Sequence, residues 1–172
     1  MYMSNALIWG SDTGVTEEIV EVMKEHLDEF SFKIINVFED EEIDYAIYDR
    51  IILGLSTWYD GELQSDWDEH FDRFKSVNFS DKKVAIFGLG DQEGYADYFI
   101  DGVGILADVV AKNGGSIFGK WPVEGYTFSK SKALVDDKTF WGLAIDEDNQ
   151  PELTDERIEH WISLLKNELF FE

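Results

Sequence analysis

Hydroxyl side chains gather in a short loop near the start of the chain, at a spacing suited to binding an anion. The loop follows the apolar run Leu7–Trp9 and contains Ser11, Thr13 and Thr16, with Gly14 among them. A helical pattern begins directly after it. The first backbone N–H groups of a helix lack partners and lie at the positive end of its dipole, and glycine lets the backbone approach a ligand closely. The stretch therefore predicts a phosphate-binding loop.

The loop contains no cation. No Lys or Arg lies between Met1 and Val22, so a phosphate bound here would be held by neutral donors alone. A second interpretation stays open at this point, because Ser and Thr are ordinary helix caps that need bind no ligand.

Two later loops each contain an aromatic residue at the end of an apolar strand pattern. Trp58 follows the run Arg50–Leu55, and Tyr95 lies in the glycine-rich segment Gly88–Asp97. The glycine spacing in this segment is one residue too long for a dinucleotide-binding G-x-G-x-x-G motif. Trp58 could simply cap the core, but two aromatics from separate loops could also stack on both faces of a flat ligand.

The sequence offers no set of groups for acid–base catalysis. The three histidines all fall in predicted helices and outside the site loops; they are His26, His70 and His160. The carboxylates of the loops are spaced too widely to predict a metal site of hard oxygen ligands. A phosphate loop with two aromatics and no catalytic group indicates that the ligand itself performs the chemistry.

The overall charge limits the classes of partner. The chain has 37 acidic and 14 basic residues and a net charge of −23, which argues against binding to nucleic acid or to an anionic membrane surface. It favours a partner with a basic patch, although solubility alone would also explain it. No cysteine is present, so disulfides, thiolate catalysis and iron–sulfur clusters are excluded. Without an apolar run of bilayer length or a signal-peptide pattern, we expect a cytoplasmic protein.

Strand and helix patterns alternate along the chain, and we expect one α/β domain over residues 1–172. The predicted strands are Asn5–Trp9, Phe32–Val37, Arg50–Leu55, Lys83–Leu89 and a last strand divided between Ser116–Phe118 and Phe140–Ile145. The predicted helices begin at Thr13, near Trp67, at Asp101 and near Ile158. This alternation predicts a parallel sheet with helices on both faces. Ligands of such sheets bind beyond the carboxyl ends of the strands, so the loops 10–16, 56–62 and 89–98 should converge.

With these loops in order, the whole chain resembles a flavodoxin of the long-chain type. Ser11–Thr16 matches the phosphate loop of that family, Thr57–Trp67 the loop of the inner aromatic, and Gly90–Asp97 the loop of the outer tyrosine. Residues 120–138 correspond to the insertion that splits the fifth strand, and Leu143–Gln150 fits the C-terminal region.

The resemblance implies a flavodoxin-like three-layer sandwich with strand order 2-1-3-4-5. It implies a one-electron carrier rather than an enzyme, with non-covalent FMN passing through its quinone, semiquinone and hydroquinone forms. The acidic residues of the site loops would oppose the anionic reduced flavin, so we expect a low-potential carrier. A flavin-dependent reductase on the same fold is the alternative. A phospho-acceptor signalling module fails, because the third strand ends in Ser56-Thr57-Trp58 and not in an acceptor Asp.

The resemblance also assigns roles to individual residues. Hydroxyl groups and backbone N–H groups of Ser11–Thr16 would bind the phosphate, Trp58 and Tyr95 would stack on the flavin ring, and Asp146 would touch the ribityl chain. The side chain of Asp12, beside a phosphate, should point toward solvent. The full expected set is Ser11, Asp12, Thr13, Gly14, Val15, Thr16, Thr57, Trp58, Tyr59, Gly61, Leu89, Gly90, Asp91, Tyr95, Asp97 and Asp146.

The partners that the resemblance implies are redox proteins with basic docking patches, meeting a monomer of this chain. Candidates are ferredoxin–NADP or flavodoxin–NADP reductases, photosystem I, and nitrogenase or pyruvate oxidoreductase systems. The aromatic residues of the insertion, among them Trp121, Tyr126 and Phe128, could pack on the sheet or help to meet such a partner.

Overall fold

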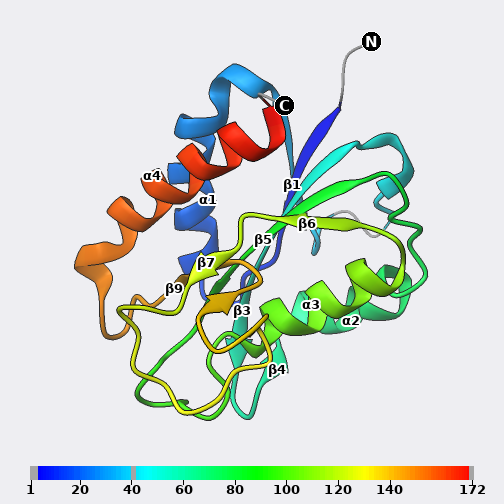
Figure 1. The fold of residues 1–172 in the computed structure, drawn as a ribbon. Coiled ribbons are helices and arrows are strands. Elements are labelled where there is room, and N and C mark those ends of the chain that lie inside the picture. The colour runs from blue at the N-terminus through cyan, green and yellow to red at the C-terminus, as the bar shows by residue number, and fades with distance from the viewer. Residues whose placement is uncertain (1–3, 40–41, 171–172) are drawn as a thin grey trace.

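The computed structural model describes residues 4–39 and 42–170, and its centre is a sheet covered by helices on both faces (Figure 1). The strands are β1 (Asn5–Trp9), β2 (Phe32–Asn36), β3 (Arg50–Trp58), β4 (Glu62–Leu63), β5 (Lys83–Leu89), β6 (Ser116–Phe118), β7 (Trp121–Pro122), β8 (Thr139–Phe140) and β9 (Leu143–Ile145). The helices are α1 (Val15–Leu27), α2 (Ser65–Phe74), α3 (Asp101–Lys112) and α4 (Thr154–Leu165), with the helical turns η1 (Asp28–Phe30), η2 (Tyr45–Ile47), η3 (Pro151–Leu153) and η4 (Lys166–Phe170). In the described ranges, no helix combines the length and apolar character that crossing a membrane requires.

The main sheet has the order β2-β1-β3-β5-β6, and these neighbouring strands are parallel. The outermost position is shared by two short strands. β6 pairs with Lys83–Ala85 at the start of β5, and β9 pairs with Phe87–Leu89 at its end. Residues 119–142 leave the sheet between them, and within this segment β7 and β8 form a small antiparallel ribbon.

The strand β3 lies at the centre because its side chains are apolar on both faces. Ile51 and Leu53 point into the core on one side of the sheet, and Ile52 points into the core on the other. This alternation follows from the two-residue period of a strand, and a near-continuous apolar run is typical of a strand covered on both faces. Gly54 leaves the space that the ring of Phe87 fills, since a Cβ there would lie 2.1 Å from Phe87 Cζ.

Each face of the sheet is covered by one pair of helices (Figure 1). Ile19 and Met23 of α1 join Ile158 and Trp161 of α4 in one apolar core. Residues of α2 and α3, among them Trp67, pack in the other. The predicted α/β class, a parallel sheet with helices on both faces, is confirmed.

Some predicted boundaries were wrong. The strand β3 continues three residues beyond Leu55, because its end pairs with β4 in a hairpin that places Thr57 opposite Leu63. The predicted last strand Phe140–Ile145 is divided: Phe140 pairs with Trp121 in the small ribbon, and only Leu143–Ile145 joins the sheet. Residues 40–41 of the acidic connection before η2 lie outside the described residues.

The insertion packs its aromatic residues against the body of the protein. The ring of Phe99 has three aromatic neighbours, with centroid distances of 5.6 Å to Tyr126, 5.5 Å to Phe128 and 5.9 Å to Phe140. The Arg157 guanidinium lies 4.1 Å from the Tyr126 ring centroid, and burial raises the pKa of Tyr126 to about 12. Of the two roles open for Tyr126 and Phe128, packing is the one observed.

We predict that replacing Gly104 by Ala destabilises the protein, because the insertion backbone lies directly against α3. A Cβ at Gly104 would lie 2.1 Å from the carbonyl oxygen of Lys132. Gly→Ala in a helix normally gains about 1 kcal/mol, but the clash should reverse the sign and lower the unfolding free energy by about 1–3 kcal/mol. Urea unfolding measures this, with the exposed Lys112→Ala as a control that should change it by less than about 0.5 kcal/mol. A Gly104→Ala protein as stable as the parent would contradict the close packing.

Candidate functional site

One cavity of about 360 Å³ lies at the carboxyl edge of the sheet, where the three predicted loops meet. Ten of the expected residues line it: Thr13, Val15, Thr16, Thr57, Trp58, Tyr59, Leu89, Gly90, Asp91 and Tyr95. Three further lining residues were missed from the sequence, namely Ser56, Glu147 and Asp148. Six expected residues do not line it: Ser11, Asp12, Gly14, Gly61, Asp97 and Asp146. The convergence of the loops is therefore observed, and the six remaining residues lie outside the cavity lining.

The first loop presents the N-terminus of α1 to the cavity. Gly14 precedes the helix with φ +88°, and no side chain caps the helix in the described structure. The Gly14 N–H donates to Ser11 Oγ at 2.9 Å. Ser11 therefore stabilises the conformation of the loop and does not line the cavity. Thr13 and the buried Thr16 face the cavity. Hydroxyl groups beside the first N–H groups of a helix are a combination that suits an anion without using a cation.

Asp12 is exposed, in line with the expectation, but its carboxylate also makes hydrogen bonds within the protein. The carboxylate accepts hydrogen bonds from the Ser65 hydroxyl and from Gln64 Nε2, the latter at 2.8 Å. Partial burial raises the pKa of Asp12, but the hydrogen bonds from Ser65 and Gln64 outweigh it and leave the pKa below its usual value. Asp12 thus ties the first loop to the start of α2.

The buried Gln64 contributes to the connection between the first loop and α2. The sequence did not single it out. Its Oε1 accepts from the Trp67 N–H at 3.3 Å and so caps α2. The backbone of Gly10 lies against it, because a Cβ at Gly10 would be 2.3 Å from Gln64 Oε1. No local pattern marks Gln64, since its role depends on a loop more than fifty residues away.

The second loop is the turn of the β3–β4 hairpin. Trp58 Nε1 donates to Ser56 Oγ at 2.9 Å, which fixes the indole at the cavity wall. Tyr59 and Gly61 both have positive φ, of +43° and +85°. This conformation costs a residue with a side chain about 1–2 kcal/mol, and the Tyr59 side chain is 60% exposed. The hairpin therefore stores strain beside the cavity.

The hairpin rests on the N-terminus of α3. Thr57 Oγ1 accepts from the Gly102 N–H at 2.9 Å. The buried Asp101 accepts from the Lys132 N–H at 2.7 Å with one carboxylate oxygen, and its other oxygen faces Gly61, where a Cβ would lie 2.5 Å from it. Burial raises the pKa of Asp101, and the hydrogen bond and charge of Lys132 offset this only in part. Gly61 thus supports the turn without lining the cavity.

The third loop is held by Asp146, whose side chain is hydrogen-bonded within the protein and does not line the cavity. Asp146 is fully buried, and its Oδ2 accepts from the Gln92 N–H at 3.1 Å and from Gln92 Nε2 at 2.7 Å. Its Oδ1 accepts from the backbone N–H groups of Asp148 and Asn149 at 3.1 and 3.0 Å. Glu147 and Asp148, the residues that follow it, line the cavity instead.

The rest of the third loop carries the exposed aromatic. Asp91 accepts from the Gly94 N–H at 2.7 Å and from Asn149 Nδ2 at 2.8 Å. Partial burial raises the pKa of Asp91, but these hydrogen bonds prevail and lower it overall. Tyr95 lines the cavity with 46% of its surface exposed, while Asp97 lies exposed outside it.

The cavity has a negative lining. Asp91, Glu147 and Asp148 contribute carboxylates, and in the described part of the chain no Lys or Arg lines it. Burial raises the pKa of Asp148, and the neighbouring charges of Asp91, Asp146 and Glu147 raise it further. These groups disfavour additional negative charge in the cavity.

The histidines lie in helices, as expected, and none lines this cavity within the described residues. His70 is buried, and its Nε2 lies 2.8 Å from the Tyr45 hydroxyl. Over the described ranges, no cluster of His, Asp or Glu has the arrangement of a metal site.

Known proteins are similar to this chain in sequence and in fold. A family model described as Flavodoxin matches residues 7–161. Flavodoxin from Haemophilus influenzae is 46% identical over 163 residues, covering 95% of this chain and 94% of that protein. Flavodoxin from Synechococcus elongatus is 48% identical over 163 residues, covering 94% and 95%. The structure of Fusobacterium nucleatum flavodoxin bound to flavin mononucleotide has a TM-score of 0.90 at 30% identity, covering 96% of this chain and 98% of that chain.

We predict that Asp101→Asn stabilises the protein increasingly as the pH rises. Because the pKa of Asp101 is raised in the folded state, folding favours its protonated form, and this contribution is lost as the pH rises from about 3.9 through the raised pKa. The Asn variant keeps an oxygen for the Lys132 N–H and has no charge to bury. Its gain in unfolding free energy over the parent should therefore grow between about pH 4 and pH 7. The exposed Asp108→Asn is the control, and a gain independent of pH for Asp101→Asn would contradict the assignment.

Proposed function

The chain belongs to the flavodoxin family, and we propose that it carries single electrons between proteins on FMN held in the cavity at the carboxyl edge of the sheet. Flavodoxins are electron-transfer proteins rather than enzymes, so the alternative of a flavin-dependent reductase is not favoured. The observation that supports the site most is the meeting of a hydroxyl-lined helix N-terminus with two aromatic residues in one cavity.

The residues present fit the chemical parts of FMN. Thr13 and Thr16, with the N–H groups at the start of α1, suit the phosphate. Trp58 and Tyr95 suit the flat apolar ring. When bound, FMN supplies the one-electron chemistry, and the chain binds, orients and shields it.

We assign different roles to the expected residues that do not line the cavity. Ser11 and Gly14 shape the phosphate loop, and Asp12 ties that loop to α2. Gly61 supports the hairpin turn, and Asp146 positions the loops on either side of it. These residues would act on FMN binding through geometry rather than by contact.

The charges of the site favour a low reduction potential. Reduction adds negative charge to the flavin, and the lining carboxylates oppose it. One charge at about 10 Å in a water-like dielectric contributes about 0.4 kcal/mol, or roughly 20 mV for one electron. The phosphate loop contains no cation to offset this effect.

The physiological partners are redox proteins, as for the family in general. We propose that they present basic docking patches, because the net charge is −23 and the cavity lining is acidic. A monomeric state and a cytoplasmic location remain predictions from the sequence.

We predict that Thr16→Val weakens FMN binding about tenfold to a hundredfold, because a hydrogen bond to a charged phosphate contributes about 1.5–3 kcal/mol. Riboflavin, which lacks the phosphate, should lose little affinity. Fluorescence titration of the flavin-free protein with each flavin measures both constants, and Thr16→Ser is the control that keeps the hydroxyl. Equal losses for both flavins would show that the phosphate binds elsewhere.

We also predict that Asp148→Asn and Glu147→Gln each raise the more negative one-electron potential by roughly 20 mV at low salt. The effect should shrink at high salt because of screening. Potentiometric titration followed in the visible spectrum measures it, with the exposed Glu156→Gln on α4 as control. A colourless purified protein that takes up no FMN would overturn the proposed function itself.

A further inference from the structure

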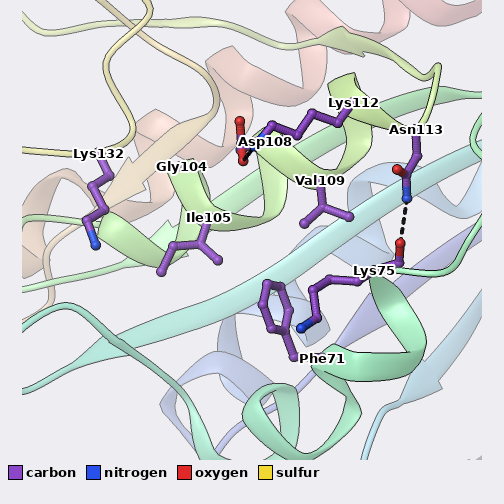
Figure 2. A pocket seen from close by; sticks show the side chains of 9 residues that line it. All are labelled: Phe71, Lys75, Gly104, Ile105, Asp108, Val109, Lys112, Asn113 and Lys132. Carbon is purple, nitrogen blue, oxygen red and sulfur yellow. Dashed lines mark hydrogen bonds and ion pairs between the residues drawn. The ribbon is translucent and has the colours of Figure 1, made fainter.

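A second hollow, of about 600 Å³, lies between α2 and α3, away from the phosphate loop. Figure 2 shows Phe71 of α2 on one side and Ile105 and Val109 of α3 on the other. Asn113 Nδ2 donates to the carbonyl oxygen of Lys75 at 2.9 Å, which joins the C-terminal ends of the two helices. We call this hollow the α2–α3 groove.

The groove has a basic rim on a strongly acidic protein. Three of the 14 basic residues line it, namely Lys75, Lys112 and Lys132. Among the residues that the structure describes, Asp108 is the one acidic residue that lines the groove, and it pairs with Lys112 at 2.7 Å. The Lys75 ammonium lies 5.0 Å from the centroid of the Phe71 ring and pairs with Asp72 at 2.9 Å. With Asp72 and Asp108 counted against the three lysines, the groove has an apolar floor and a net charge of +1, in contrast to the acidic lining of the FMN cavity.

The groove continues toward the proposed flavin site. A further hollow of about 730 Å³ shares Phe71 and Ile105 with the groove and extends to Trp58 and Tyr59 of the β3–β4 hairpin. Trp58 and Tyr59 also line the FMN cavity. A partner that approaches the flavin beside the hairpin could therefore extend along this path into the groove.

We propose that the α2–α3 groove docks an acidic segment of the redox partner, with an apolar side chain seated on Phe71, Ile105 and Val109. This inference rests on the proposed function, because it identifies the occupant as a protein that also meets the flavin edge. The lysines complement carboxylates of the partner, and the floor buries an apolar side chain. An acidic surface alone attracts a basic patch in many orientations. A local site of the opposite charge would select one orientation, since mismatched orientations place like charges together.

The test uses the FMN-loaded protein and a blocked peptide with a central phenylalanine flanked by glutamates. Amide resonances of Phe71, Ile105 and Val109 should shift on titration to about 1 mM peptide, and a peptide with lysines in place of glutamates should not shift them. The double variant Lys112→Glu with Lys132→Glu should weaken binding at least tenfold. The control Lys24→Glu with Lys33→Glu changes the net charge equally at exposed sites on α1 and β2 and should change affinity less than twofold.

A second variant separates loss of binding from loss of folding. Ile105→Asp removes apolar floor without touching the lysines, and it should also weaken peptide binding at least tenfold. An unchanged visible spectrum reports intact folding and FMN binding in every variant. Absence of shifts in the groove, equal loss in the control pair, or equal binding of the lysine peptide would overturn the docking proposal while leaving the electron-carrier proposal intact. Failure of the parent protein to bind FMN would instead overturn the proposed function.

Discussion

Parallel pairing of β1, β3 and β5 is the constraint on which the site depends. Because the three strands run in one direction, the chain leaves each of them at the same edge of the sheet. Ladder hydrogen bonds continue into the first residues of the loops. The Gly10 N–H donates to the Gly54 carbonyl at 3.2 Å, and the Gly90 N–H donates to the Ile145 carbonyl at 3.0 Å. The phosphate loop and the tyrosine loop therefore start at positions that the sheet fixes.

Beyond the ladder, carboxylates hold the loops in place. Asp12 joins the first loop to α2, Asp101 joins α3 to the insertion, and Asp146 joins the third loop to the turn after β9. A carboxylate suits this task because its two oxygens can accept several hydrogen bonds from different segments. Part of the acidic composition thus organises the site, and only part of it faces a ligand or partner.

The difference between side chains with a local role and side chains that connect distant segments explains what could be predicted from the sequence. The run Arg50–Leu55 and the loop Ser11–Thr16 carry local signals, since burial on both faces requires apolar residues and an anion site requires donors at a helix start. Asp146 carries no such signal. Its position after a strand is compatible with ligand contact and with a structural role, and its hydrogen bonds to Gln92 and Asn149 form only when distant segments meet.

The same limit applies to elements that form by pairing across the sequence. The strand β3 extends to Trp58 because the two-residue strand β4 pairs with its end in antiparallel fashion. Phe140 lies outside the main sheet because it pairs with Trp121 in the small ribbon. Such short partners are too brief for a periodic pattern. Ser56 lines the cavity from the end of β3, where the sequence predicts a loop.

The distribution of charge separates two stages of recognition. A net charge of −23 gives a field that draws a basic partner toward the molecule from any direction. At physiological ionic strength this field is screened beyond about 8 Å, so the final orientation depends on charges in close contact. At the cavity of the carboxyl edge those charges are the carboxylates Asp91, Glu147 and Asp148. In the α2–α3 groove they are three lysines, two of which pair with Asp72 and Asp108. Because the cavity and the groove carry charges of opposite sign, a partner with complementary charges would fit in one orientation along the surface. A uniformly acidic face would not select an orientation. Fast encounter and a single electron-transfer orientation can therefore be set by different residues of the same protein.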